Sequence, residues 1–521
     1  MTVRVPDWVS YHARVRPNEP ALRAIETGRT YTWEELGARV SALAAIMSSR
    51  YGIGCGDRVV LVAENDPRIF EVQFACLRLG AIMVPLNWRL SHAELTAIVA
   101  DATPTAIFYD RGWREVGVRL ARQHGVQYTL AWDCEGDADD YERMIEKSLR
   151  LGELLDGGRT DGDDLSHILY TSGTTGAPKG ALSSRGTLMW HALNMAHVCG
   201  MAEPGCHHLN TLPLFHAGGL NNYSNAILYW GGCVSTTRRF SAQATLDLLT
   251  DPGLRVTHYC GIPQMWVDIA MLASFATATF PALRHPLFGG PAANMDQEEI
   301  RRLWEARGVY VHLAYGSSEQ GPLSVVLDQA DGESAGKGSS GICVPYVEIR
   351  LVNDAGDEVP LGEIGEIWVR GPAITPGYWK RSKSESFSGN WFRTGDLAWT
   401  DELGHYYVVG RLRDVYRTGG ENVYPAEVER ILEQMPEVAE ISVVGVPDDK
   451  WGETGAAFIV PAPGERPDLA TVRQFAEGRL ARYKLPVHVI LVDELPRSAT
   501  FKVVRTELRE RFAAMRSRID D

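Results

Sequence analysis

The hydrophobic pattern of the first hundred residues changes its period several times. Between residues 32 and 50, apolar positions recur every three to four residues, which predicts an amphipathic helix. Apolar runs at 58–63 and 81–85 predict buried strands, and a helix is predicted between them at 70–79, ending at Gly80. A strand, a helix and a second strand in this order indicate a parallel sheet covered by helices.

The pattern becomes rich in β-structure from about residue 347. Short runs at 347–352, 365–370 and 405–409 are bounded by glycine and aspartate, which is typical of antiparallel strands joined by turns. Farther along, an amphipathic helix is predicted at 426–434 and a strand at 441–446. We therefore expect an α/β chain: a large N-terminal domain of layered sheets with helices and a β-rich subdomain, then a small α+β C-terminal domain.

Composition and charge narrow the function classes. The 521 residues carry 52 Lys and Arg against 66 Asp and Glu, and the net charge of −14 argues against coating of nucleic acid or a basic membrane-binding surface. Hydrophobic residues at 45% allow a large core, and the length is typical of about two to four domains. The sequence has no long apolar run and no signal-peptide pattern, so a soluble cytoplasmic protein without a membrane span is expected.

Two other patterns carry little functional weight. The eight cysteines include no CxxC pair and no cluster with histidine, so disulfides and a zinc site are both poorly supported. The segment 336–341 satisfies GxGxxG, but no strand-like run precedes it and the following ICVP cannot open a helix cleanly. A dinucleotide-binding site is therefore not expected there.

The most informative segment reads YTSGTTGAPKG from Tyr170 to Gly180 and follows a strand-like run at 166–170. Its hydroxyls and glycines allow Oγ atoms and backbone N–H groups to surround a phosphate chain, and Lys179 supplies a positive charge. The order differs from that of a Walker A loop, because glycine follows the lysine. Composition alone would also suit a flexible surface loop.

The whole segment resembles the signature loop of the adenylate-forming superfamily, which includes acyl-CoA synthetases, firefly luciferase and the adenylation domains of nonribosomal peptide synthetases. Seven further motifs follow in the order that the family shows, so the resemblance covers essentially the full chain and is greatest to acyl- or aryl-CoA ligases. The motifs are PLFHAGG from Pro213, FGGP from Phe288, AYGSSE from Ala314, RTGD from Arg393, GRLRD from Gly410, GGENVYP from Gly419, and LPR from Leu495, which leads to Lys502.

The resemblance implies two domains and a reaction in two steps. Residues 1–412 would bind ATP and the acid, with the β-rich subdomain at about 347–410, and residues 413–521 would form a mobile lid with its hinge at Arg413. The acid attacks the α-phosphate of ATP to give acyl-AMP and pyrophosphate, and a thiol then displaces AMP. ATP, Mg²⁺ and coenzyme A are the implied cofactors and cosubstrates.

The resemblance also implies residue roles in the first step. Tyr315 would stack on adenine, Asp396 would bind the ribose hydroxyls, and Glu319 would bind Mg²⁺ through oxygen. Lys502 would bridge the carboxylate and the α-phosphate, which makes Lys502, Glu319 and His216 the candidate catalytic residues. The full set of implied ATP or AMP contacts is Thr171, Ser172, Gly173, Thr174, Thr175, Lys179, Gly290, Pro291, Tyr315, Gly316, Ser318, Asp396 and Arg411.

For the acid and the thiol, the resemblance implies two further groups of residues. His216 would be an aromatic gate beside the acid and thiol channels, and Gly419, Gly420 and Glu421 would line the CoA channel. The mixture of aromatic and small residues in the implied acid pocket favours a ring-bearing or compact hydrophobic acid over a long straight chain, although the same residues could be core packing. The implied acid pocket comprises His216, Asn221, Tyr223, Tyr259, Phe288, Gly290, Ala314 and Gly321.

The chain departs from the family pattern at two positions. Ser318 replaces the usual threonine and keeps the hydroxyl. Phe501 precedes Lys502 where the family usually has glycine, and phenylalanine adopts a positive φ only at a cost. A chain impaired in adenylation, converting preformed acyl-adenylate and CoA to acyl-CoA, is therefore the alternative hypothesis. In the simpler interpretation, Phe501 points away from the nucleotide.

The expected partners are small molecules. The segment 211–235 contains no aspartate to pair with a substrate ammonium, which argues against an amino-acid substrate, and no carrier domain follows Lys502. We therefore expect a carboxylic acid or an acyl-adenylate, with CoA as the thiol, and a monomer or homodimer. A non-catalytic nucleotide-binding regulator is the second alternative, and the presence together of Glu319, Asp396, Arg411 and Lys502 argues against it.

Overall fold

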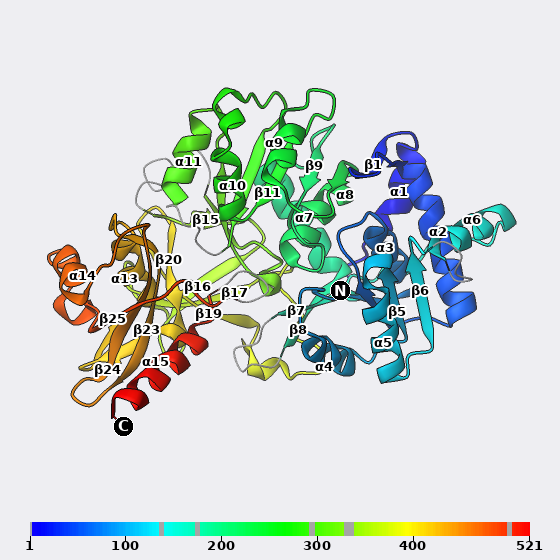
Figure 1. Ribbon diagram of the computed structural model, residues 1–521. Helices are drawn as coiled ribbons and strands as arrows, with labels where there is room; N and C mark the ends of the chain where they lie inside the picture. The colour runs from blue at the N-terminus through cyan, green and yellow to red at the C-terminus, as the bar shows by residue number, and fades with distance from the viewer. Residues whose placement is uncertain are drawn as a thin grey trace. The chain divides into compact units, whose positions relative to one another are not determined.

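The computed structural model describes residues 3–134, 140–171, 178–290, 297–327, 338–497 and 503–520, with side chains to residue 516. The chain divides into two compact units (Figure 1). The first unit comprises the described residues within 1–290, 297–348 and 369–392, and the second comprises those within 349–368 and 393–521. The helices of the first unit are α1 (Trp8–Val15), α2 (Trp33–Tyr51), α3 (Arg68–Leu79), α4 (His92–Ala102), α5 (Arg114–His124), α6 (Tyr141–Leu151), α7 (Arg185–Cys199), α8 (Ala226–Trp230), α9 (Ala242–Thr250), α10 (Pro263–Ala270) and α11 (Gln297–Glu305).

A six-stranded sheet in the first unit carries the signature loop. Its strand order is β6-β5-β3-β4-β7-β8, and all neighbours are parallel except β7 and β8, which form an antiparallel pair. Helix α5 packs against β5, as Figure 1 shows in blue and cyan. The strands are β3 (Arg58–Val62), β4 (Ile82–Pro85), β5 (Ala106–Asp110), β6 (Tyr128–Trp132), β7 (Leu165–Thr171) and β8 (Lys179–Ser184).

A nine-stranded sheet forms the other layer of the first unit. Its order is β15-β14-β13-β12-β11-β9-β10-β1-β2, and the run from β13 to β1 is parallel throughout. The carboxyl ends of β11, β12 and β13 therefore lie along one edge of the sheet, where α/β proteins usually bind ligands. The strands are β1 (Pro20–Ala24), β2 (Thr30–Thr32), β9 (His207–Asn210), β10 (Cys233–Thr236), β11 (His258–Gly261), β12 (His285–Gly289), β13 (His312–Tyr315), β14 (Val325–Leu327) and β15 (Ile342–Cys343).

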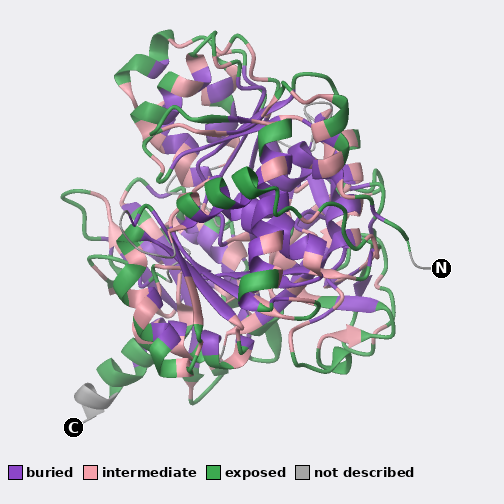
Figure 2. Ribbon diagram, turned by 90° about the vertical axis from the view of Figure 1, so that its right-hand side faces the viewer, coloured by how far each residue is buried: buried purple, intermediate pink, exposed green. Residues whose placement is uncertain are grey.

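Local sequence signals explain where the first helices begin and end. Helix α2 starts with a capping box, in which Glu35 N–H donates to Thr32 Oγ1 at 3.2 Å and Thr32 N–H donates to Glu35 Oε2 at 2.8 Å. Gly80 ends α3 in the left-handed conformation, with φ of +73°. The buried faces of these helices and the central strands form the core, which Figure 2 shows as purple residues on strands and inner helix faces.

Beyond residue 347 the strands are mostly antiparallel, as the sequence predicts. A five-stranded sheet contains β16 (Glu348–Val352), β17 (Gly365–Arg370), β18 (Phe387–Ser388), β19 (Trp391–Thr400) and β20 (Tyr406–Arg411). A second five-stranded sheet contains β21 (Tyr416–Thr418), β22 (Glu421–Val423), β23 (Val438–Asp448), β24 (Gly452–Pro461) and β25 (His488–Leu491), with helices α13 (Pro425–Leu432), α14 (Leu469–Ala476) and α15 (Arg505–Asp520). The α/β fold class expected from the sequence is confirmed.

Two details bear on the expectations about cysteines and membranes. All eight cysteines lie within the described residues; Cys55 is exposed, Cys343 is half-buried and the other six are buried. Among the described residues, no helix combines the length and the apolar character needed to cross a bilayer.

The GxGxxG segment continues into the short strand β15 rather than into a helix, so the dinucleotide interpretation is excluded on geometry.

Candidate active site

The flanks of the signature loop lie side by side on an antiparallel strand pair. Thr171, the last residue of β7, is paired in register with Lys179, the first residue of β8. The Thr171 hydroxyl donates to the Lys179 carbonyl at 3.4 Å. The hairpin thus fixes both ends of the loop; Ser172, Gly173, Thr174 and Thr175 lie outside the described residues.

Glu319 lies in a short 3₁₀ helix, η4 (Ser318–Gln320), and is 9% exposed. The Tyr378 hydroxyl donates to Glu319 Oε1 at 2.8 Å. The Lys179 ammonium nitrogen lies 5.6 Å from the centroid of the same Tyr378 ring. The tyrosine therefore connects the predicted metal ligand with the predicted phosphate-binding lysine, and none of the motifs quoted above includes it.

A single carboxylate is compatible with Mg²⁺ when the remaining ligands come from substrate phosphates and water. Within the described parts of the chain, no group of three or more His, Cys, Asp or Glu residues could hold a metal by itself. The Glu319 carboxylate is an oxygen donor of the kind that Mg²⁺ prefers, so this residue fits the ion that the family motif implies.

Two predicted nucleotide contacts lie at the carboxyl edge of the nine-stranded sheet. Tyr315 ends β13, and Gly290 directly follows β12 with φ of +116°. The Gln320 side-chain amide donates to the Tyr315 hydroxyl at 3.2 Å. Gly316 is packed so closely that a Cβ there would overlap the Pro322 carbonyl. The backbone after β13 is therefore fixed by packing; Pro291 lies outside the described residues.

Several predicted acid-pocket residues form an aromatic wall near this edge. Tyr259 in β11 and Phe288 in β12 are fully buried, and both pack on Trp266, with ring centroids 5.0 and 6.5 Å apart. Ala314, in β13, is 6% exposed and is paired with Gly289 in the neighbouring strand. The wall therefore combines rigid aromatic rings with small residues.

The PLFHAGG motif leads into a π-helical segment, η2 (Gly218–Asn225), of a kind that is frequent at functional sites. His216 Nδ1 accepts from the Gly218 N–H at 3.1 Å and so begins this turn. Asn221, within the segment, contacts His167 of β7: Asn221 Nδ2 lies 3.0 Å from His167 Nε2. Burial lowers the pKa of His167 to about 3, so this histidine is a neutral partner that helps to hold the amide.

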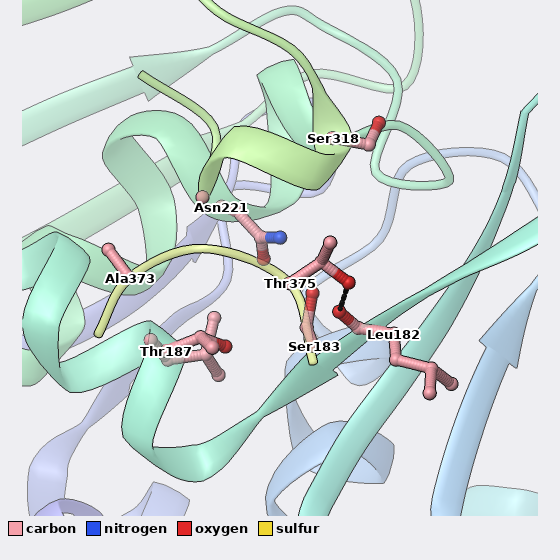
Figure 3. Close-up of a pocket in the computed structure, with 9 residues that line it drawn as sticks. Leu182, Ser183, Thr187, Asn221, Ser318, Ala373 and Thr375 are labelled. Atoms are coloured by element: carbon pink, nitrogen blue, oxygen red, sulfur yellow. Dashed lines mark hydrogen bonds between the residues drawn. The ribbon is translucent and has the colours of Figure 1, made fainter. Parts of the chain in front are cut away.

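A small pocket brings three of the predicted residues together (Figure 3). It has an empty volume of about 210 Å³, part of it open to solvent, and its lining includes several hydroxyls. The Thr375 hydroxyl donates to the Leu182 carbonyl at 2.8 Å, as the dashed line in Figure 3 shows. The lining residues are Leu182, Ser183, Thr187, Leu188, Asn221, Ser318, Gly321, Ala373 and Thr375.

Tyr223 lies among histidines at or next to the first residues of strands in the nine-stranded sheet. It is fully buried, and its ring centroid lies 5.4 Å from that of His208 and 5.6 Å from that of His258. Its hydroxyl donates to the His285 carbonyl at 3.1 Å, and His258 stacks on His285 at 4.9 Å. Burial lowers the pKa of His208 and of His258 to about 3. We call His208, His258 and His285 the histidine row.

In the second unit, two predicted nucleotide contacts are paired with each other. Asp396 in β19 and Arg411 in β20 face each other in register, and Arg411 Nε lies 3.0 Å from Asp396 Oδ1. Asp396 is 7% exposed, whereas the Arg411 side chain is 41% exposed. The ion pair holds the carboxylate in one orientation.

The remaining predicted residues lie in turns of the second unit. Arg413 is in the 3₁₀ helix η7 (Leu412–Asp414). Gly419 and Gly420, with φ of +59° and +90°, form the turn between β21 and β22, and Glu421 begins β22. A Cβ at Gly419 would lie 3.0 Å from the Trp451 ring. Phe501 and Lys502 lie outside the described residues.

Comparison with known proteins agrees with this geometry. Residues 9–379 match the family of AMP-binding enzymes, and residues 427–502 match the C-terminal domain of AMP-binding enzymes. An indoleacetate–CoA ligase from Aromatoleum aromaticum is 35% identical over 513 residues, which cover 98% of each chain. A feruloyl-CoA synthase from Amycolatopsis is 36% identical over 508 residues, which cover 97% of this chain and 98% of the relative.

Solved structures give the same result. The o-succinylbenzoate CoA synthetase of Bacillus subtilis in complex with its acyl-adenylate intermediate has a TM-score of 0.84 at 28% identity, covering 97% of this chain and 98% of that chain. The same enzyme in complex with ATP and magnesium also has a TM-score of 0.84 at 28% identity, covering 97% of this chain and 100% of that chain. Since the family match includes well over half of the residues, this chain belongs to the AMP-binding enzymes of the adenylate-forming superfamily.

Proposed function

We propose that this protein, an AMP-forming acyl-CoA ligase that uses ATP, Mg²⁺ and coenzyme A, activates a ring-bearing or compact hydrophobic carboxylic acid. The observation that carries the choice of acid is that the predicted pocket residues Tyr259 and Phe288 are rigid, buried rings packed on Trp266, next to the strand that holds the small residue Ala314. Flat rings pack well against such a wall, whereas a long alkyl chain needs a deep channel. Two relatives are named for indoleacetate and for a feruloyl group, which supports the same choice.

In the first half-reaction a carboxylate oxygen of the acid bonds to the α-phosphorus, and the bond from that phosphorus to pyrophosphate breaks. Lys179, Thr171 and the loop between them are proposed to bind the β- and γ-phosphates, with Tyr315 on the adenine. Mg²⁺ on Glu319 would offset the phosphate charge. Because little covalent chemistry falls to the protein, its contribution is positioning and electrostatic stabilisation.

The proposed ribose site belongs to the second unit. Asp396 accepts hydrogen bonds as a carboxylate, and its partner Arg411 holds it in place at 3.0 Å. Both hydroxyls of a ribose can donate to one carboxylate, so this pair suits a ribonucleotide. Ser318, in the same short helix as Glu319, is proposed as an additional hydroxyl contact to phosphate.

In the second half-reaction the thiol of CoA attacks the acyl carbon, a thioester bond forms, AMP leaves with the bonding electrons, and the thiol proton is released to water. We propose that residues 413–521 act as a lid that turns at Arg413 between the two steps and brings Gly419, Gly420 and Glu421 to the CoA channel. Glycines at a tight turn leave room for a substrate close to the backbone. Lys502 is proposed to act in the first step only.

A panel of carboxylic acids tests this proposal. AMP release with CoA, and ATP–pyrophosphate exchange without CoA, should both depend on the acid. Indole-3-acetate, ferulate and phenylacetate should give kcat/KM at least about tenfold above octanoate and decanoate, because misfit in an apolar pocket costs about 1–3 kcal/mol. Faster turnover of the straight-chain acids would refute the choice of acid. Thioester formation from synthetic acyl-adenylate without exchange would indicate impaired adenylation, and no turnover at all would indicate a regulator.

A further inference from the structure

We propose that Tyr378 is a positioning residue, which orients the Glu319 carboxylate for Mg²⁺ and supports Lys179 beside the phosphates. The inference rests on the proposed function, because it assigns to Glu319 and Lys179 the roles given above. It adds a residue that belongs to none of the sequence motifs. The juxtaposition is direct: one phenol contacts the metal-binding carboxylate, and its ring lies next to the lysine ammonium.

The two contacts use different parts of the tyrosine. The hydroxyl donates to Glu319 Oε1 at 2.8 Å, so one carboxylate oxygen has a fixed partner. A hydrogen bond to one oxygen restricts rotation of the carboxylate and leaves the second oxygen able to bind an ion. The aromatic ring, 5.6 Å from Lys179 Nζ, attracts the ammonium through its electron-rich face. The hydroxyl and the ring can therefore be tested separately.

Backbone hydrogen bonds hold the segment around Tyr378 on two sides, toward Glu319 and toward strand β8. On the side of Glu319, the Thr375 N–H donates to the Glu319 carbonyl at 2.8 Å. On the side of β8, the Leu182 N–H donates to the Gly377 carbonyl at 3.1 Å, and the Trp379 N–H donates to the Gly180 carbonyl at 2.8 Å. The segment 375–379 thus ties η4 to the strand that Lys179 begins.

This arrangement predicts that loss of the Tyr378 hydroxyl and loss of its aromatic ring have different effects. Outer-shell partners of metal ligands orient the ligand, and their loss typically costs about 10–100-fold in metal affinity or activity. Loss of the hydroxyl should therefore weaken the response to Mg²⁺ and spare ATP binding in the absence of the metal. Loss of the ring should in addition weaken ATP binding without metal, because the Lys179 ammonium loses its attraction to the aromatic ring.

The test uses Tyr378→Phe, Tyr378→Leu and the matched control Tyr407→Phe in the full-length protein. Tyr407 donates to Asp401 Oδ2 at 3.0 Å in the second unit, so the control removes a phenol–carboxylate bond to a residue that is not a predicted ligand. Calorimetric titration gives the ATP dissociation constant with EDTA and with Mg²⁺, and steady-state kinetics gives the Mg²⁺ concentration for half-maximal rate. Thermal unfolding checks that each variant is folded.

For Tyr378→Phe we expect the gain in ATP affinity that Mg²⁺ provides to fall about tenfold, with unchanged affinity in EDTA and a rate that excess Mg²⁺ restores. Tyr378→Leu should also bind ATP more weakly in EDTA, and Tyr407→Phe should match the wild type in every measurement. An unchanged Mg²⁺ response in folded Tyr378→Phe would overturn the inference, as would a loss of rate that excess Mg²⁺ does not restore. Failure of the proposed function would instead appear as an inactive wild type.

Discussion

Mild acid should unfold this protein, because several histidines are buried in the neutral form. An isolated histidine titrates at about 6.5. Below that pH the unfolded chain binds protons that the folded chain excludes, so the free energy of unfolding falls as the pH falls. The histidines with folded pKa values of about 3 to 4 are His167, His191, His207, His208 and His258.

The size of the effect follows from these shifts. Each such histidine lowers the free energy of unfolding by about 1.4 kcal/mol for each pH unit below about 6.5. At pH 5.5 the five together cost about 7 kcal/mol, which is comparable to the whole stability of a typical domain at about 5–15 kcal/mol. An isolated Asp or Glu side chain titrates at about pH 4, below this window.

Urea unfolding followed by tryptophan fluorescence at pH 7.5, 6.5, 6.0 and 5.5 measures this dependence. The free energy of unfolding should be nearly constant above pH 7 and then fall steeply. In His258→Gln, which removes one member of the histidine row, the slope below pH 6.5 should decrease by about 1.4 kcal/mol per pH unit. A free energy at pH 5.5 within about 1 kcal/mol of the value at pH 7.5 would refute the reasoning, because even one buried neutral histidine predicts more.

Three further outcomes are expected. Asp396→Asn should raise the KM for ATP by about 10–100-fold, since hydrogen bonds to a charged group contribute about 1.5–3 kcal/mol, and an unchanged KM would contradict the ribose role. Gly316→Ala should lose several kcal/mol of stability or fail to fold, because its Cβ would overlap the Pro322 carbonyl. Circular dichroism during urea unfolding measures this loss, and an unfolding midpoint equal to that of the wild type would contradict the prediction. Thr32→Ala should cost about 1 kcal/mol in the same assay and leave kcat/KM unchanged, since it removes only the cap of α2.

The sequence predicts the periodic elements of this fold well. The helix expected at 32–50 is α2 (Trp33–Tyr51), and the strand expected at 58–63 is β3 (Arg58–Val62). The helix expected at 70–79 starts two residues earlier as α3 and ends at Gly80 as predicted. Amphipathic periods and glycine caps are local signals, so a single sequence is sufficient to recognise them.

Sequence patterns predict the candidate site less well than the fold, because several of its contacts join segments that are distant in the chain. Asp396 and Arg411 were predicted as separate nucleotide contacts, and only the pairing of β19 with β20 reveals that they bind each other. Tyr378 and His167 stand out in no motif, because their importance depends on Glu319 and Asn221, which are 59 and 54 positions away. The same holds for the histidine row, whose members are spread along the chain and meet only through strand order.

The distribution of thiols allows the native protein to be labelled selectively at one cysteine. Cys55 is the exposed cysteine, whereas burial raises the pKa of Cys260 and of Cys343 to about 12 and keeps both in the less reactive protonated form. A maleimide dye added to the native protein should therefore attach at Cys55 first. The first unit can carry a fluorophore at one defined position without any cysteine being removed, and the slower labelling of the other thiols then reports how often the core opens.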